Sequence, residues 1–342
     1  MSIIYAFLVS CIVTLTITPW MRKLAMRTGF MDIPDARKAH AHPTPFLGGL
    51  AVFFGLACSF LLFRDHSPHS LIIGVGAFAT LLLGLWDDKK PASAKNKLIG
   101  QIAIACLTYF SGLSISFFTD PFSGGVIYLG WVSFPITVLW IVSMMNTLNL
   151  IDGMDGLASG VSAICAFMMT LVAIALGQYP VALLSASILG ATLGFLRYNF
   201  MPAQIFLGDA GSLLLGYLLA TVSIIGVLKS TLTLAMLLPL LMLAVPIFDT
   251  VDAIVRRVRR GQPIYMADRD HIHHRLLRMG FNPKQVVLIL YALTVIFGAI
   301  ALTLGWFNHI YALVACAIVF VFFRIFLARF KQFPSYLLRF FR

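Results

Sequence analysis

The hydrophobic and polar positions of this chain alternate in long blocks, not with the short periods of a soluble protein. Apolar runs of roughly the 17–25 residues that a helix needs to cross a bilayer are separated by short polar segments. The pattern predicts eleven membrane-spanning helices, at about residues 2–20, 47–63, 71–86, 98–116, 131–150, 157–176, 180–196, 211–228, 232–255, 285–305 and 308–327. We therefore expect an all-α integral membrane protein, built as one polytopic domain over residues 1–342.

Composition supports the same class. The chain is 60% hydrophobic and only 11% charged, whereas a soluble domain carries about 25% charged residues. All 13 acidic residues are aspartates, and the five cysteines lie inside apolar runs. We interpret these cysteines as small hydrophobic residues, not as a disulfide framework or a metal site.

The basic residues are distributed unevenly between the polar segments. If the N-terminus lies outside, all of the 25 lysines and arginines except Arg64 and Lys229 fall on the cytoplasmic side. This satisfies the positive-inside rule and predicts a cytoplasmic C-terminus. The net charge of +12 is then a topology signal, helped by attraction to anionic lipids, and does not indicate a nucleic-acid partner. Every aspartate except Asp65 and Asp120 falls on the same side, so chemistry is expected at the cytoplasmic face.

The segment at residues 146–160, NTLNLIDGMDGLASG, lies between two apolar runs yet contains Asp152 and Asp155. An aspartate on a spanning helix costs about 3 kcal/mol. The three-residue spacing predicts two carboxylates on one face of a helical turn, and the glycines permit close approach of backbone or ligand. A polar loop between two spans is the alternative interpretation.

Two adjacent aspartates, Asp87 and Asp88, end the third apolar run. Adjacent carboxylates repel each other unless protons or a cation intervene, and a divalent metal bound to a phosphate would remove the repulsion. The neighbouring Lys89 and Lys90 could neutralise the pair instead. Lys97, at the start of the next run, is expected to return to the same site.

Asp209 follows Gly208 at the start of the eighth apolar run. The N-terminus of a helix favours anions, and an aspartate there can cap the helix or hold a metal. Phe206, just before it, could stack on a base or face lipid. Both interpretations of each residue remain open at this point.

The longest cytoplasmic segment, at residues 256–280, contains His271, His273 and His274 among several arginines. Three histidines could ligate zinc, but histidine and arginine together suit a diphosphate better. A solvated basic loop is the simpler alternative. Elsewhere, Arg37, Lys38 and His40 could meet an anion or only set the topology, whereas Asp252 is expected to pair with Arg256 beside Asp249.

Taken together, these segments resemble the polyprenyl-phosphate N-acetylhexosamine-1-phosphate transferase family. The matching motifs are GLWDD at 84–88 with Lys97 after it, NLIDGMDGLA at 149–158, FLGDAGS at 206–212 and DRDHIHHRLL at 268–277. They follow the family's order along nearly the whole chain. The HIHHR form resembles the bacterial branch that uses UDP-GlcNAc more than the branch that uses UDP-MurNAc-pentapeptide. One departure, Ala92 where that branch usually has leucine before Ser93, concerns local packing.

The resemblance implies transfer of GlcNAc 1-phosphate from UDP-GlcNAc to undecaprenyl phosphate, with release of UMP, as the first membrane step of a cell-envelope polysaccharide pathway. It implies Mg²⁺ as the cofactor, with Mn²⁺ as a substitute, in the bacterial cytoplasmic membrane. A homodimer is left open.

The resemblance also implies roles for individual residues. The catalytic set comprises Asp87, Asp88, Asp152 and His271. The metal ligands are Asp209, as the main one, with Asp88 and Asp152. The substrate-binding set comprises Lys97, Asn149, Asp155, Asn199, Phe206, His273, His274 and Arg275, of which Asp155, Asn199 and Phe206 are expected to face the uridine.

Two other functions fit parts of the pattern. A sister enzyme that uses another UDP-N-acetylhexosamine would have the same motifs. A membrane transporter would also have many spans with aspartates, but transporters place ionisable groups near the midplane and often have repeated halves. This chain concentrates its carboxylates at the ends of the apolar runs and has no internal repeat.

Overall fold

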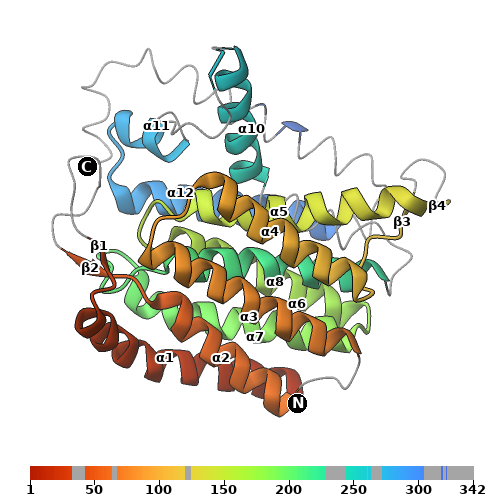
Figure 1. Cartoon of the computed structure of the whole chain (residues 1–342), viewed down its shortest axis with the longest axis horizontal. Coiled ribbons are helices and arrows are strands. Elements are labelled where there is room, and N and C mark those ends of the chain that lie inside the picture. The colour runs from red at the N-terminus through yellow and green to blue at the C-terminus, as the bar shows by residue number, and fades with distance from the viewer. Residues whose placement is uncertain are drawn as a thin grey trace. The chain divides into compact units, whose positions relative to one another are not determined.

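The computed structural model describes residues 1–32, 43–63, 68–119, 125–228, 244–259, 261–262 and 272–303, with the short pieces 317–318 and 321. The chain divides into two compact units, Met1–Pro239 and Leu240–Arg342, and each is described by itself. Nearly all of the regular structure is helical (Figure 1). Seven helices among the described residues are long and apolar enough to cross a membrane, which confirms the predicted all-α integral membrane class.

The first unit contains eight α-helices among its described residues. They are α1 (Ser2–Thr28), α2 (Gly48–Phe63), α3 (Pro68–Lys89), α4 (Ala94–Phe110), α5 (Ser133–Ile151), α6 (Leu157–Ala175), α7 (Tyr179–Asn199) and α8 (Gly208–Leu228). The described part of the unit also contains two short antiparallel strand pairs and a 3-10 turn: β1 (Met31–Asp32) with β2 (Thr44–Pro45), β3 (Phe117–Thr119) with β4 (Val126–Tyr128), and η1 (Gly130–Val132).

The predicted apolar runs coincide with these helices over most of the first unit. The run at 98–116 is wrong at its end, because α4 stops at Phe110 and the chain turns through Gly112 toward β3. Helices α2 and α4 have 16 and 17 residues, slightly fewer than the roughly 20 of a typical span. The run at 232–255 is described only from Ala244 onward, and the run at 308–327 lies almost entirely outside the described residues. The count of eleven spans therefore stays a prediction.

Helix α8 forms the centre of the first unit. Within its apolar part, 89% of the residues are buried, and it packs against α2, α3, α5, α6 and α7. It crosses α3 so closely that a Cβ atom at Gly84 would collide with the backbone of Ala210, so only glycine fits there. This crossing brings the last turn of α3 beside the first turn of α8.

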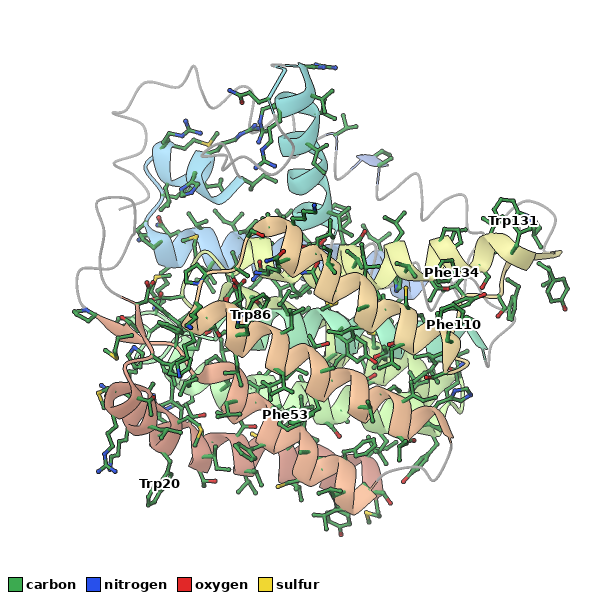
Figure 2. The ribbon with its side chains drawn as sticks, viewed as in Figure 1. Trp20, Phe53, Trp86, Phe110, Trp131 and Phe134 are labelled. Atoms are coloured by element: carbon green, nitrogen blue, oxygen red, sulfur yellow. The ribbon has the colours of Figure 1, made fainter. Side chains whose placement is uncertain are left out.

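Large apolar side chains lie on the outer surface of the helices (Figure 2). Trp86 on α3 is 45% exposed, and Phe110, Tyr128 and Trp131, near the junction of α4 and α5, are 76%, 77% and 84% exposed. Such a surface is unusual in water but suits lipid, and tryptophan and tyrosine favour the interface between lipid and water. The exposed side chains agree with the membrane-spanning assignment.

Inside the bundle, polar side chains pair across helices. The hydroxyl groups of Thr108 on α4 and Tyr217 on α8 are 3.1 Å apart. The indole Nε1 of Trp140 on α5 donates to Ser223 Oγ on α8 at 2.9 Å. Such pairing satisfies polar groups where water does not reach them.

In the second unit, α10 (Ala244–Arg259) and α11 (Ile272–Arg278) pack on α12 (Pro283–Thr303). Asn282 and Gln285 cap the start of α12 reciprocally. The backbone N–H of Gln285 donates to Asn282 Oδ1 at 2.8 Å, and the backbone N–H of Asn282 donates to Gln285 Oε1 at 2.9 Å. This arrangement is a capping box, and it fixes where α12 begins.

Candidate active site

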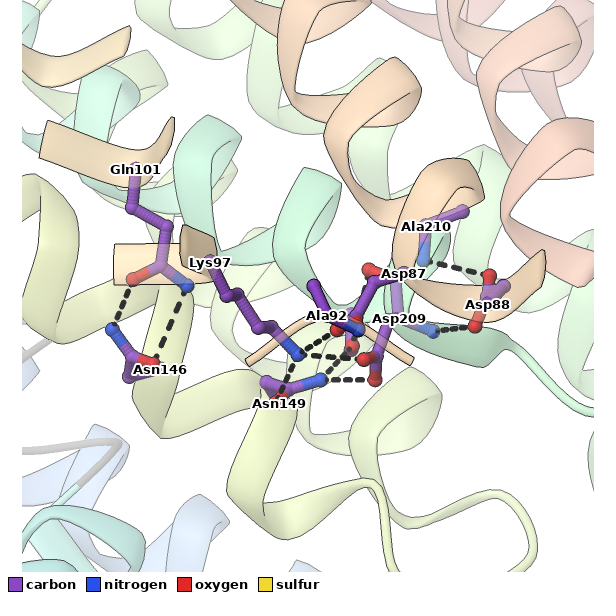
Figure 3. A network of polar contacts seen from close by, with 10 residues as sticks. Asp87, Asp88, Ala92, Lys97, Gln101, Asn146, Asn149, Asp209 and Ala210 are labelled. Atoms are coloured by element: carbon purple, nitrogen blue, oxygen red, sulfur yellow. Dashed lines mark hydrogen bonds and ion pairs between the residues drawn. The ribbon is translucent and has the colours of Figure 1, made fainter. Parts of the chain in front are cut away.

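Charged and amide side chains from the ends of four helices come together at one place. The end of α3 supplies Asp87, the first turn of α4 supplies Lys97, the last turn of α5 supplies Asn149 and the first turn of α8 supplies Asp209 (Figure 3). We call these four residues the charged corner. Residues separated by more than a hundred positions meet here because α3 crosses the start of α8, and because only four residues separate α3 from α4.

Lys97 is the hub of the charged corner. Its Nζ atom lies 2.8 Å from Asp87 Oδ2 and 2.6 Å from Asp209 Oδ2, and it also donates to Asn149 Oδ1 at 3.1 Å. The Lys97 side chain is only 16% exposed. Burial alone would lower the pKa of its ammonium, but the carboxylates of Asp209 and Asp87 outweigh that effect and hold the pKa above its usual value. Lys97 is therefore a permanent cation between two anions.

Asn149 connects Lys97 and Asp209 from the side of α5. While its carbonyl oxygen accepts from Lys97, its Nδ2 atom donates to Asp209 Oδ1 at 2.6 Å and to Ser212 Oγ at 2.9 Å. An amide can serve both neighbours because it has a donor and an acceptor. Asn149 thereby fixes the orientation of the Asp209 carboxylate relative to the ammonium.

Asp87 and Asp88 are neighbours in sequence but point to different partners. Asp87, which is 8% exposed, accepts at Oδ1 from the backbone N–H of Ala92 at 2.8 Å and faces Lys97 with Oδ2. Asp88 accepts from the backbone N–H groups of Asp209 and Ala210 at 2.8 and 3.1 Å. Lys97 therefore compensates the charge of Asp87, and backbone N–H groups compensate the charge of Asp88. Neither Lys89 nor Lys90 takes part in these contacts.

Asp88 acts as a cap for α8. The first N–H groups of a helix have no partners within the helix, and the helix dipole favours a negative charge beside them. Gly208, directly before them, has a φ of 74°, and a Cβ there would press on the Asp88 carboxylate. The sequence GD at 208–209 therefore lets Asp88 approach the helix end, and Asp88 holds the backbone from which the Asp209 side chain projects.

Asp152 and Asp155 do not share a helical face, so that prediction is wrong. Helix α5 ends at Ile151 and α6 begins at Leu157, and both aspartates lie in the turn between them. Burial, followed by the charges of Asp209 and Asp88, raises the pKa of Asp152 well above its usual range. Asp155 instead turns toward the α7–α8 loop, residues 200–207, and accepts from the backbone N–H of Ala203 at 2.8 Å.

Asn199 belongs to the framework of the same α7–α8 loop. Its Oδ1 atom accepts from Ser159 Oγ at 2.7 Å and its Nδ2 atom donates to the carbonyl of Ile205 at 3.0 Å. The residue is only 2% exposed. Its amide therefore holds the loop.

Phe206 is fixed through its backbone. Its N–H donates to the carbonyl of Pro45 at 2.8 Å, and its carbonyl accepts from the N–H of Gly48 at 3.0 Å. The N–H of Gly49 continues the pairing with the carbonyl of Leu207 at 2.8 Å. The loop before α8 is thus hydrogen-bonded to the start of α2. Phe206 itself is half-buried and lies three residues before Asp209.

The remaining predicted residues belong to other parts of the chain. In the second unit, His274 is exposed and Arg275 is half-buried on α11. His271, the side chain of His273, and the side chains of Asp249 and Asp252 lie outside the described residues. Arg37, Lys38 and His40 lie outside them as well.

One pair of site-adjacent residues was not predicted. Gln101 on α4 and Asn146 on α5 bond to each other through their side-chain amides, one helical turn from Lys97 and Asn149. A signal for this pair existed in the sequence. A glutamine inside an apolar helix needs a partner, and the spacings of four residues on one helix and three on the other place each amide on the same face as a member of the charged corner.

The oxygen atoms of the charged corner suit a hard divalent cation. Among the described residues, no three His, Cys or Asp side chains converge into a metal-binding group, but Mg²⁺ needs only one or two carboxylates together with water and phosphate oxygens. Asp209 is 34% exposed, the most open carboxylate paired with Lys97, and each of its oxygens keeps a second lone pair. Asp88 is less suitable, because its oxygens accept from backbone N–H groups of α8, which are fixed in place, whereas the partners of Asp209 are side chains that can move.

Comparisons with known proteins agree on one group of enzymes. Residues 70–227 match the family described as glycosyl transferase family 4. The chain is 42% identical over 303 residues to a probable undecaprenyl-phosphate N-acetylglucosaminyl 1-phosphate transferase of Bacillus subtilis, covering 88% of this chain and 85% of the relative. It is 36% identical over 314 residues to a decaprenyl-phosphate N-acetylglucosaminephosphotransferase of Mycolicibacterium smegmatis, covering 83% and 77%. An undecaprenyl-phosphate alpha-N-acetylglucosaminyl 1-phosphate transferase of Escherichia coli K12 is 27% identical over 274 residues, covering 79% and 75%.

Proposed function

We propose that this chain, which belongs to the polyprenyl-phosphate sugar-1-phosphate transferases of glycosyl transferase family 4, transfers GlcNAc 1-phosphate from UDP-GlcNAc to undecaprenyl phosphate. The observation that carries the proposal is the charged corner. It joins a buried cation, two carboxylates and an amide at the ends of membrane helices, where a lipid phosphate and a water-soluble nucleotide can meet. The similarity to the B. subtilis and E. coli relatives supports the identity of both substrates.

The reaction exchanges one phosphorus–oxygen bond for another. An oxygen of the lipid phosphate attacks the phosphorus that carries the sugar, and UMP leaves with the electron pair of the broken bond. A phosphate monoester has its second pKa near 6, so the attacking group is already mostly dianionic at pH 7. The protein therefore contributes mainly by positioning two polyanions and screening their repulsion.

The contacts of Lys97 and Asp87 suit positioning and charge screening better than they suit proton transfer. Lys97 stays charged beside Asp87 and Asp209 and adds a fixed positive charge to the site. Asp87 is bound to Lys97 and to the Ala92 backbone, so we assign it the role of orienting Lys97. If Asp87 were the base instead, the rate of Asp87→Asn would recover as the pH rises above the phosphate pKa. Exchange of labelled UMP into UDP-GlcNAc without lipid would point to a covalent aspartyl-phosphate.

A magnesium ion, or manganese in its place, completes the proposed site. When bound, it supplies positive charge that stabilises the diphosphate and the charge that develops on the leaving UMP. Asp209 is proposed as its main protein ligand, with Asp152 and the Asn149 carbonyl as further oxygen donors. The exposure of Asp209 and the hard oxygen chemistry of this set support the assignment.

Further substrate contacts are proposed at two places. Phe206 is assigned to the side of the uridine, together with the Asp155 oxygen that does not accept from Ala203. Asn199 is assigned to the framework because its Oδ1 and Nδ2 atoms both bond within the protein. His271, His273, His274 and Arg275 are assigned to the diphosphate and sugar. A homodimer is compatible with this function but is not required by it.

The proposed location is the bacterial cytoplasmic membrane, with the N-terminus outside and the C-terminus and the catalytic face in the cytoplasm. The distribution of the 25 basic residues supports this orientation. The test is an engineered cysteine in the loop at residues 256–284, in a cysteine-free background. It should resist a membrane-impermeant reagent in intact cells and react after the cells are opened.

The proposed reaction is tested with purified protein, undecaprenyl phosphate and a panel of UDP-sugars. UMP should be released with UDP-GlcNAc, only when the lipid phosphate is present. Faster release with another UDP-N-acetylhexosamine would favour a sister specificity. Uptake of a nucleotide sugar into sealed vesicles without UMP release would instead favour a transporter.

A further inference from the structure

We propose that Gln101 and Asn146 form a positioning pair that holds α4 and α5 in the register in which Lys97 reaches both Asp87 and Asp209. The inference rests on the proposed transferase function and adds two residues to it. Neither residue belongs to the charged corner, and neither contacts a charged group among the contacts described here (Figure 3).

The two amides satisfy each other almost completely. Asn146 Nδ2 donates to Gln101 Oε1 at 2.7 Å, and Gln101 Nε2 donates back to Asn146 Oδ1 at 3.3 Å. Asn146 Nδ2 also donates to the carbonyl of Val142 within its own helix at 2.8 Å. Gln101 has no exposed surface. A shift of α4 along α5 would break both inter-helix bonds together and leave buried amide groups without partners, which is unfavourable.

The placement of the pair connects it to Lys97. Gln101 lies four residues after Lys97 on α4, and Asn146 lies three residues before Asn149 on α5, so each amide is on the same helical face as a member of the charged corner. Lys97 itself is in the first turn of α4, which begins after the Ser93 cap. The amide pair is thus the adjacent fixed contact between the two helices, one turn further along.

The pair also differs from the charged corner in what it can do during turnover. Lys97, Asn149 and Asp209 must change partners when a diphosphate and a cation arrive, so they cannot alone maintain the register of the helices. Among the described residues, the two neutral amides bond only to each other and to the backbone of α5, so the arrival of a diphosphate or a cation gives them no reason to rearrange. A buried polar pair commonly specifies one register among several that apolar packing would allow.

The experiment compares two disruptive variants with a control that removes another buried hydrogen bond made by α4. Gln101→Leu and Asn146→Leu remove the hydrogen bonds of the pair while keeping a similar number of side-chain heavy atoms. Tyr217→Phe removes the hydrogen bond between Thr108 on α4 and Tyr217 on α8, 3.1 Å long, which is another buried polar contact of α4. Displacing a catalytic group by about 1 Å can lower the rate roughly a hundredfold. We therefore expect kcat for UMP release to fall by about tenfold to a hundredfold in both leucine variants.

In these variants the KM values for both substrates should stay near those of the wild type, and Tyr217→Phe should keep nearly the wild-type kcat. The exchanged double variant Gln101→Asn/Asn146→Gln retains two amides of the same combined length, and it should recover most of the lost kcat. Equal losses in Tyr217→Phe, or no recovery in the exchanged variant, would overturn the positioning role.

A second measurement does not depend on turnover. Lys97 is 16% exposed and held by two carboxylates, so an amine-acylating reagent should modify it slowly, relative to the exposed Lys89 and Lys90. Acylation of Lys97 should accelerate in Gln101→Leu but not in Tyr217→Phe, as measured by peptide mass spectrometry. An unchanged Lys97 rate in Gln101→Leu would refute the positioning role. This result would be decisive even if the wild-type protein released no UMP, an outcome that would refute the proposed function separately.

Discussion

The charged corner and the residues that hold the α7–α8 loop both use aspartate and asparagine, but the two regions use these residue types in opposite ways. In the charged corner, Asn149 and Asp209 bond to other side chains, and Asp209 remains 34% exposed. Beside the loop, Asp155 in the α5–α6 turn bonds to the backbone of Ala203. Asn199 at the end of α7, 2% exposed, bonds to the backbone of Ile205 and to Ser159. The same residue types therefore form a reactive cluster in one place and a framework in the other.

The difference shows how to separate the two roles in a polar membrane site. A carboxylate that accepts from backbone N–H groups has a fixed, permanent partner, so its replacement should act mainly on folding. A carboxylate held by a lysine and an amide can change partners when a phosphate or cation arrives, so its replacement should act mainly on turnover. Asp88 is instructive because it lies beside the charged corner but is bound like a framework residue.

The largest expected effect follows from Asp209→Asn. The change removes the negative charge proposed to hold Mg²⁺, while the side chain keeps its size and its one remaining oxygen can accept from Asn149 or from Lys97. Loss of an electrostatic contact of this kind costs about a hundredfold to a thousandfold in kcat. UMP release measured across a magnesium titration is the check. A variant with wild-type rate and unchanged magnesium dependence would refute the assignment.

Lys97→Met should have the next largest effect, on both turnover and stability. It leaves the carboxylates of Asp87 and Asp209 facing each other without a cation, and breaking a buried ion pair costs about 3–5 kcal/mol. Because the folded protein raises the Lys97 pKa, the stabilisation is fully present below the ordinary value of 10.5 and is lost as the pH rises above it. In detergent, the melting temperature of the wild type should therefore fall as the pH rises above 10.5, whereas that of Lys97→Met should not show this fall. Parallel pH curves would contradict this role.

Asp88→Ala should have a moderate effect that falls mainly on stability. The change removes the cap from the first N–H groups of α8, and loss of a cap costs about 0.5–2 kcal/mol. Asp88→Asn, which keeps an acceptor oxygen, should recover part of the loss. The magnesium concentration for half-maximal rate should be unchanged in both variants, and a large increase would restore Asp88 as a metal ligand.

Asn199→Ala should have the smallest effect on turnover. It removes the bonds to Ser159 and Ile205 from a buried position, which costs about 1–3 kcal/mol, and it contacts neither the charged corner nor its partners. The melting temperature should fall, while the KM for UDP-GlcNAc stays near its wild-type value. If KM rises strongly at unchanged stability, then Asn199 contacts the nucleotide, as the family resemblance implies.

Much of this architecture follows from the sequence because membrane helices have a strong local signal. Apolar runs located each of α1 to α8, although α1 continues to Thr28, past the predicted end at residue 20, and α4 stops at Phe110, before the predicted end at residue 116. The GD at 208–209 indicated a helix start. The partners of individual carboxylates did not follow, because Asp87 and Asp88 are equivalent in sequence and differ only through the crossing of α3 with α8. Asp152 and Asp155 were expected on a helix because their spacing fits one, but α5 ends at Ile151, and the turn that follows contains Gly153 and Gly156.

The central claim is that the sugar moves together with its phosphate, and UDP-GlcNAc labelled with ³²P in the phosphate that carries the sugar tests this claim directly. After incubation with undecaprenyl phosphate, the label should be found in the lipid and the released nucleotide should be unlabelled UMP. Asp209→Asn, treated in the same way, should leave the label in UDP-GlcNAc. If the label is released as UDP while unlabelled sugar enters the lipid, then the chain transfers the sugar alone and the proposed reaction is wrong.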